Sequence, residues 1–290
     1  MQSENNPFDA LMPAAMAHKA EEVGVNKATK DPVQSFYLAI TAGVFISIAF
    51  VFYTTVTTGA GEMPYGMAKL IGGLAFSLGL ILVVICGGEL FTSSVLTTVA
   101  RASGRITTPQ LLRNWVAVYL GNMVGAFFFV VMIWLAQQHM TGNGAWGINA
   151  MKIAQYKLHH SFGQAVALGV LCNLMVCLAV WMTFSCRSAT DKILVMLLPI
   201  AMFVASGFEH SIANMFMIPM GIVISNFAGP EFWIATEHVP AEFADLTMSH
   251  FIFNNLIPVT LGNIIGGGFL VGMTYWVLHR RPELKAKLVR

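Results

Sequence analysis

Charged side chains are scarce in this chain. Aspartate, glutamate, lysine and arginine make up 10% of its 290 residues, whereas 56% are hydrophobic. An average soluble domain carries about 25% charged residues. The formal net charge of +2 also provides no basic surface for a nucleic acid. The composition therefore predicts a protein with several membrane spans, whose surroundings are the lipid bilayer and which has no nucleic-acid partner.

Signals for export, redox chemistry and metal binding are missing as well. The polar stretch 1–31 contains no apolar run of a signal peptide, so we expect the amino terminus to stay where it is made. Cys172 and Cys177 match neither a redox motif nor a zinc spacing, so we expect small buried residues and no disulfide. No nucleophile arrangement or nucleotide loop is recognisable. The sequence thus predicts no enzyme and no cofactor.

Six apolar segments are long enough for the roughly 20 residues that the hydrocarbon core requires. The segments are 36–57, 67–100, 111–136, 162–186, 193–227 and 251–278. The second and fifth are too long for one straight span, so each is predicted to be two half-helices joined by non-helical backbone. Such backbone is tolerated at membrane depth only where protein buries it or where it lines a cavity.

Lysine and arginine are distributed unevenly over the connections. Most of the 16 lie in the amino-terminal stretch, the second and fourth connections and the tail, and the connection 228–250 has none. Because positive residues stay on the cytoplasmic side, we expect both termini to be cytoplasmic. Asn6-Pro7 and Asp9 predict the start of an amphipathic helix that ends near Gly24. This helix either lies on the membrane or a neighbouring subunit, or acts as a gate.

The two halves of the chain share motifs. Gly121-Asn122 with Gly125 in the third segment matches Gly262-Asn263 with Gly266 in the sixth, and both patterns favour close helix packing. Glu89 and Glu209 also correspond. Because three spans separate the copies, the second half must be inverted. The predicted fold is an all-α membrane protein with six transmembrane helices, an aquaporin-like 3+3 inverted repeat and broken second and fifth helices.

Ionisable residues lie inside two apolar segments. An ionisable group at membrane depth costs a few kcal/mol at least and marks a functional site. Glu89 and Glu209 adjoin the predicted breaks, and His210 is the only one of eight histidines within a span. Either the two glutamates relay protons or each accepts backbone amides of its break, with Asn122 or Asn173 as further partners. We favour the scaffold role because both breaks carry a copy.

The motifs around the breaks resemble those of the formate/nitrite transporter family. The resemblance rests on Glu89-Leu90-Phe91-Thr92, on the stretch 209–214 and on both Gly-Asn repeats, and it covers nearly the whole chain. It implies a homopentamer with one pore per subunit in the bacterial inner membrane. Formate or formic acid would pass in both directions. The domains would be an amino-terminal helix and linker (1–35), a channel domain (36–278) and a basic cytoplasmic tail (279–290).

A small carboxylate meets a large barrier in a dry constriction. Moving a bare anion into such a medium costs tens of kcal/mol in the Born limit, whereas protonating an acid with a pKa near ~4 costs about 4 kcal/mol at pH 7. Protonation is the easier route. His210 could lend the proton, or it could hydrogen-bond the anion while water supplies the proton. The sequence leaves both open.

The resemblance also implies roles for individual residues. Thr92, His210 and Asn263 would be the selectivity positions, the hydroxyl and the amide replacing an anion's hydration without trapping it. Lys157 would draw anions to the outer mouth, although an interfacial lysine explains it as well. The pore constrictions would be formed by Phe76, Leu80, Leu90, Phe91, Val176 and Phe203.

Other substrates and classes compete with formate. Nitrite, hydrosulfide, acetate and lactate fit the same motifs. A water or glycerol channel of the aquaporin type is the alternative from another class, but both breaks lack the sequence Asn-Pro-Ala. A proton-coupled mechanism and a simple channel are both compatible with the residues.

Overall fold

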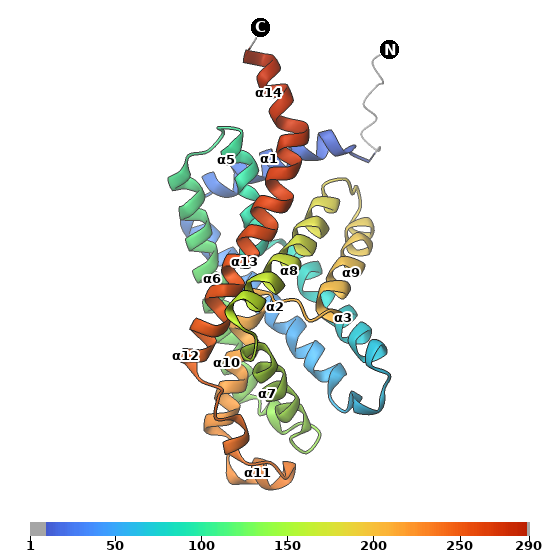
Figure 1. Ribbon diagram of the computed structural model, residues 1–290, viewed down its shortest axis with the longest axis vertical. Coiled ribbons are helices and arrows are strands. Elements are labelled where there is room, and N and C mark those ends of the chain that lie inside the picture. The colour runs from blue at the N-terminus through green and yellow to red at the C-terminus, as the bar shows by residue number, and fades with distance from the viewer. Residues whose placement is uncertain (1–9, 289–290) are drawn as a thin grey trace.

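The computed structural model describes residues 10–288, and this range is helical, without strands (Figure 1). Helices satisfy their backbone internally, as lipid requires. The α-helices are α1 (Pro13–Thr29), α2 (Pro32–Thr57), α3 (Tyr65–Leu82), α4 (Phe91–Ser94), α5 (Thr98–Ala102), α6 (Thr108–Leu135), α7 (Ala145–Leu158), α8 (Phe162–Thr183), α9 (Ala189–Ala205), α10 (Ser211–Phe227), α11 (Pro230–Thr236), α12 (Met248–His250), α13 (Ile257–Asn263) and α14 (Arg281–Leu288). The π-helical stretches are η2 (Val83–Gly87), η6 (Phe251–Leu256), η7 (Ile264–Met273) and η8 (Trp276–Arg280). The 3₁₀ turns are η1 (Ala60–Glu62), η3 (Val95–Thr97), η4 (Gln138–Met140) and η5 (Pro240–Phe243).

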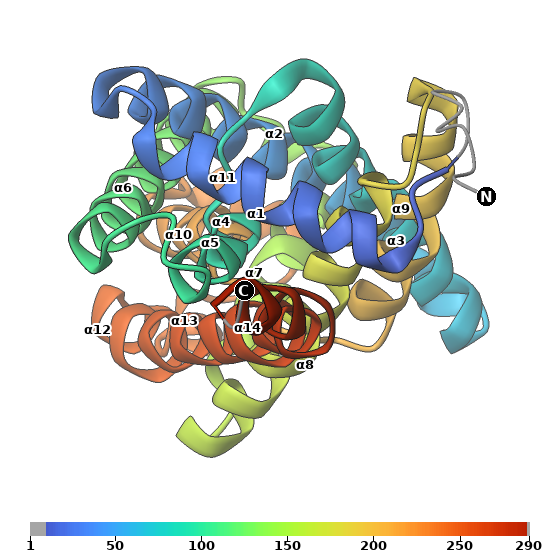
Figure 2. The same cartoon turned by 90° about the horizontal axis from the view of Figure 1, so that it is seen from above.

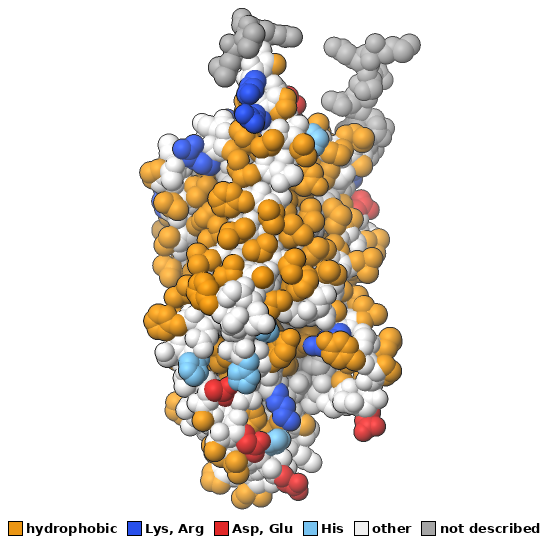
Figure 3. Space-filling view, viewed as in Figure 1, with side chains coloured by type: hydrophobic (Ala, Val, Ile, Leu, Met, Phe, Trp, Pro, Cys, Tyr) orange, Lys and Arg blue, Asp and Glu red, His pale blue; other side chains and the backbone are white. Residues whose placement is uncertain are grey.

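Five helical stretches in residues 10–288 are long and apolar enough to cross a membrane. A sixth is present if α10 and α11, which are bent by 104° at their junction, count as one span. Hydrophobic side chains cover the middle of the face seen in Figure 3, and charged side chains gather toward its two ends. The five stretches are Pro32–Thr57, Tyr65–Gly87, Thr108–Leu135, Phe162–Thr183 and Pro240–Ala286.

Both long apolar segments are broken where the sequence predicts. α9 and α10, of 17 residues each, are joined by non-helical backbone at 206–210, and a second break at 88–90 precedes α4. Gly87 (φ +85°) and Gly207 (φ +73°) take left-handed conformations that side chains disfavour. In the earlier of the two segments the helices on either side of the break are unequal, because α3 continues through η2 to Gly87 over 23 residues and the break follows at 88–90.

Two further features differ from the sequence prediction. α7 forms in a connection where no helix was expected; it buries Trp146, Met151 and Ala154 and exposes Lys152, an amphipathic pattern that a search for apolar spans overlooks. α1 does not end near Gly24 but continues to Thr29. Gly24 instead allows α1 to pack closely against Ala100. The predicted helix start at Asn6-Pro7 and Asp9 lies outside the described residues.

α1 lies across one end of the helical bundle, beside the carboxyl-terminal helix (Figure 2). Buried Glu21 fixes it there, with Arg280 at 2.8 Å and Arg105 at 2.9 Å. Burial raises the pKa of Glu21, but hydrogen bonds and charge from the arginines outweigh it, and the net shift is downward. Lys27 of α1 forms a second anchor through its ion pair with Glu89.

Glycines bring pairs of helices into backbone contact, as predicted. α2 packs on α6, and α8 packs on α13 and η7. A Cβ at Gly125 would overlap the carbonyl oxygen of Ile40, and a Cβ at Gly266 would overlap that of Val170. The carbonyls belong to partner helices that cannot shift without moving the bundle.

We therefore predict that Gly266→Ala destabilises the protein by about 1–3 kcal/mol through overpacking. Gly163→Ala is the control, because a Cβ there meets nothing within 4 Å, and surface changes stay within about 0.5 kcal/mol. Thermal unfolding in detergent measures both variants. Equal melting temperatures would contradict the packing role.

Candidate functional site

The break before α10 is held together by one buried amide. Asn263 donates through Nδ2 to the carbonyl oxygens of Gly169 (2.8 Å) and Glu209 (3.0 Å). Its Oδ1 accepts the backbone N–H of Ser211 at 2.9 Å. The Asn263 side chain thus satisfies backbone groups that the interrupted helix leaves without partners.

Asn122 makes the same bonds at the other break. It donates to the carbonyl oxygens of Ala39 (2.7 Å) and Glu89 (2.9 Å) and accepts the N–H of Phe91 (2.9 Å). Both asparagines are fully buried. The repeated Gly-Asn motif in the sequence therefore marks two equivalent backbone hubs.

These bonds correct two sequence interpretations. Asn263 was expected to offer its amide to an anion, but backbone groups occupy that amide. Asn122 and Asn173 were expected beside the glutamate carboxylates, yet Asn122 binds backbone only, and Asn173 donates to the carbonyl oxygens of Thr92 (2.9 Å) and Asn263 (2.6 Å). A buried asparagine amide can form hydrogen bonds either to a substrate or to backbone groups, and the sequence alone does not distinguish these two roles.

The two glutamates are buried and pair with lysines rather than with backbone amides. Glu89 binds Lys27 of α1 and Lys30, which directly follows α1, both at 2.7 Å. Glu209 binds Lys157 of α7 at 2.8 Å. Because an unpaired buried carboxylate is strongly unfavourable, these contacts fix α1 and α7 to the breaks. Sequence reasoning missed Lys27 and Lys30, which lie at the carboxyl-terminal end of α1.

Glu209 has further partners that sequence reasoning missed. Its Oε2 accepts from Asn214 at 2.6 Å and from Asn255 at 3.0 Å. Asn255 also donates to the carbonyl oxygen of Lys157 at 3.0 Å. The carboxylate is thereby held by one ammonium and two amides.

His210 is the N-cap of α10 and faces Thr92 across the two breaks. Its Nδ1 accepts the N–H of Ala213 at 3.1 Å, and its Nε2 lies 3.1 Å from Thr92 Oγ1. A nitrogen that accepts carries no proton, so the neutral ring holds its hydrogen on Nε2 and donates it to Thr92. Phe203 stacks on the ring at 6.1 Å between centroids.

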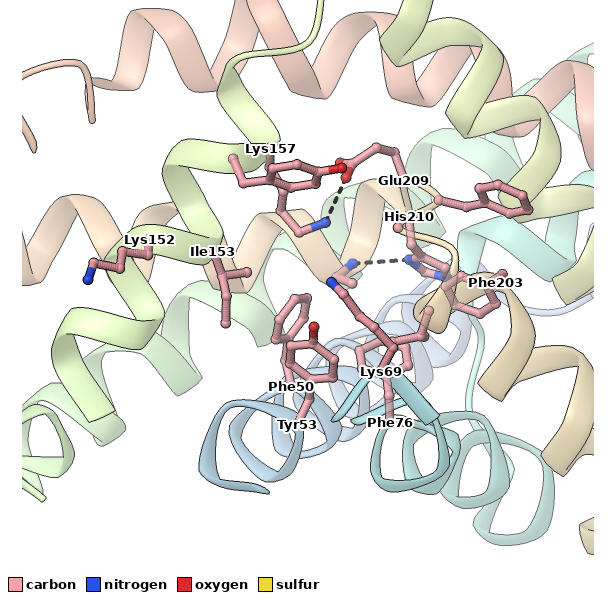
Figure 4. A pocket seen from close by; sticks show the side chains of 15 residues that line it. Phe50, Tyr53, Lys69, Phe76, Lys152, Ile153, Lys157, Phe203, Glu209 and His210 are labelled. Atoms are coloured by element: carbon pink, nitrogen blue, oxygen red, sulfur yellow. Dashed lines mark hydrogen bonds and ion pairs between the residues drawn. The ribbon is translucent and has the colours of Figure 1, made fainter. Parts of the chain in front are cut away.

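A cavity of about 230 Å³ opens beside His210 (Figure 4). Lys157 and Glu209 form its polar wall with Lys69 and Lys152. Lys157 is buried in this wall, where it pairs with Glu209. The remaining lining is mainly aromatic, from Phe50, Tyr53, Phe76, Tyr156, Phe203 and Phe208. An anion in this cavity would meet ammonium groups and one imidazole.

His210 also lines a separate, much smaller cavity of about 10 Å³, roughly enough for one water molecule. Five of the six predicted constriction residues line this small cavity, the apolar neck: Phe76, Leu80, Leu90, Val176 and Phe203. Phe91 does not; it packs on Tyr119 (4.9 Å) and Trp115 (6.2 Å). A second cavity of about 240 Å³, lined by Lys27, Gly88 and Ser93, lies under α1.

The fold and site define a class of protein. An all-helical membrane protein with two broken helices, a charged cavity and an apolar neck is a channel or transporter for small solutes. The family model for the formate/nitrite transporters matches residues 14–277, so the chain belongs to this family.

The sequences of individual relatives match this chain over almost their full length. The formate channel FocA of Escherichia coli (strain K12) is 66% identical over 279 residues, which are 96% of this chain and 98% of that protein. FocA of Haemophilus influenzae is 54% identical, covering 94% and 97%. A solved structure described as a pentameric formate channel with formate bound superimposes with a TM-score of 0.83 at 61% identity, covering 86% of this chain and 98% of that one.

We predict strong coupling between Lys157 and Glu209 in a double-mutant cycle. Lys157→Met or Glu209→Gln alone should cost about 3–5 kcal/mol, because either leaves a buried charge unpaired. The double variant should lose less than the sum. Thermal unfolding in detergent measures the cycle, with exposed Lys152→Met of the same helix as control. Additive losses would show that the pair is not coupled.

Proposed function

We propose that this chain is a formate channel of the bacterial inner membrane, bidirectional, with one pore in each protomer of a homopentamer. The observation that carries the proposal is the His210–Thr92 contact between the cationic cavity and the apolar neck. The formate channels of two bacteria at 66% and 54% identity support formate as substrate. The pentameric solved relative supports the assembly.

The finer architecture belongs to the same proposal. Six transmembrane helices form a 3+3 inverted repeat, which the matching Asn122 and Asn263 hubs support. Residues 36–278 form the channel domain between the amino-terminal part (1–35) and the basic tail (279–290). The distribution of lysine and arginine supports cytoplasmic termini.

His210 acts in this mechanism as a hydrogen-bond donor rather than as the source of the proton. A neutral imidazole that released its Nε2 proton would become an imidazolate, and a doubly protonated ring would lose the Nδ1 bond from Ala213. A proton carried as hydronium by the water in the cavity is therefore transferred to the carboxylate and leaves neutral water behind, while His210 and Thr92 hold the carboxylate at the neck. Formic acid then crosses the apolar residues without the cost of a buried charge.

We predict that His210→Phe lowers formate exchange in proteoliposomes by at least about ten-fold, since a hydrogen bond to a charged group contributes about 1.5–3 kcal/mol. His210→Asn is the control for assembly, because asparagine caps helices well. Size-exclusion chromatography checks that both variants form the wild-type oligomer. Wild-type flux in His210→Phe would refute the role.

The neck residues should select for size. Leu80→Ala enlarges the apolar neck, so we predict a higher ratio of acetate to formate flux than in the wild type. Leu74→Ala, on the same helix but exposed, should leave the ratio unchanged. A panel of formate, nitrite, hydrosulfide, acetate and lactate on reconstituted protein measures selectivity. An unchanged ratio in Leu80→Ala would place the selective point elsewhere.

A further inference from the structure

The carboxylates at the two breaks differ in the charge that surrounds them. Glu89 has one lysine on each oxygen, Lys27 on Oε2 and Lys30 on Oε1. Glu209 has a lysine only on Oε1, and its Oε2 is held by the neutral amides of Asn214 and Asn255. Glu89 and its two lysines thus carry one surplus positive charge, whereas Glu209 and Lys157 together are neutral.

His160 occupies the place of a second cation at Glu209. Its Nε2 lies 4.0 Å from Glu209 Oε1, and its side chain is only 12% exposed. This nitrogen is buried and has no hydrogen-bond partner among the described residues. Lys157 uses only part of the acceptor capacity of Oε1, so a protonated His160 would find an acceptor within a small ring movement.

We propose that His160 is a titratable second counter-ion of Glu209, neutral at neutral pH and cationic in acid. In acid it gives the Glu209 carboxylate a second counter-ion, as Lys30 does for Glu89 at all pH values. The proposal rests on the proposed function, because it concerns entry of the anion.

The groups that surround His160 determine whether its pKa is raised or lowered. Glu209 approaches from the break before α10, Lys157 and Tyr156 from α7, and His159 from the adjacent position. Burial lowers the pKa of His160, Glu209 raises it, and Lys157 and His159 lower it, with a net downward shift. The imidazole is therefore neutral near pH 7 and becomes charged only as the pH falls.

The two mouths then respond differently to acid. A unit charge acting over roughly 10 Å in a partly wet cavity raises the local anion concentration about two- to ten-fold. Acid on the α7 side increases formate entry from that side, which the proposed topology makes the outer face. Entry past Lys27 and Lys30 at the other break gains nothing from His160.

The test compares His160→Gln, which is neutral at every pH, with His160→Lys, which is permanently cationic. Initial formate uptake into right-side-out membrane vesicles is measured at outer pH about 5 and about 7.5, on either side of the ordinary histidine pKa. The formic acid concentration differs between the two pH values. Each variant is therefore compared with wild type at the same pH, where this concentration is equal. His160→Gln should match wild type at the higher pH and fall about two- to ten-fold below it in acid. His160→Lys should exceed wild type at the higher pH.

His159→Gln is the matched control, because that neighbouring imidazole is exposed and pairs with Asp245 at 2.6 Å. It should follow wild type at both pH values. A wild-type pH response in His160→Gln would overturn the inference. If His160→Gln does not assemble, the inference is overturned when His160→Lys takes up formate at the wild-type rate at the higher pH. No formate uptake by the wild type would instead refute the proposed function.

Discussion

Everything at the centre of this molecule depends on satisfying the backbone of two interrupted helices at membrane depth. Unpaired peptide groups cost several kcal/mol each in hydrocarbon. Asn122 and Asn263 each provide two donors and one acceptor to their break. With the backbone fixed in this way, His210 and Thr92 lie opposite one another at 3.1 Å, at the start of the apolar neck.

Buried charge links the pore to its surroundings. Glu209 fixes α7 through Lys157, and Glu89 fixes α1 through Lys27 and Lys30. α1 is also tied to the carboxyl-terminal end through Glu21 and Arg280. Movement of α1 away from the bundle would leave Glu89 without its partners, which is unfavourable for a buried carboxylate. The position of the amino-terminal helix is therefore coupled to the first break.

The sequence was sufficient for features that leave a local pattern. Apolar segments too long for one span predicted both breaks, and the repeated Gly-Asn motif predicted that they are equivalent. It was insufficient where partners are remote in the chain: Lys27 lies 62 residues from Glu89, and Lys157 lies 52 residues from Glu209. Asn263 was misassigned because a buried amide suits substrate and backbone alike. The contacts of Phe91 with Tyr119 and Trp115 were not predicted, because an aromatic residue beside a break can face either the pore or a neighbouring helix.

The central claim is that His210 is held as a neutral hydrogen-bond donor whose Nδ1 caps α10. Nitrogen NMR of ¹⁵N-histidine-labelled protein in lipid bilayers tests it directly, with the His210 signal assigned by difference from His210→Asn. Near pH 7 we predict an unprotonated Nδ1 and a protonated Nε2. A ring protonated on Nδ1, alone or together with Nε2, would contradict the account.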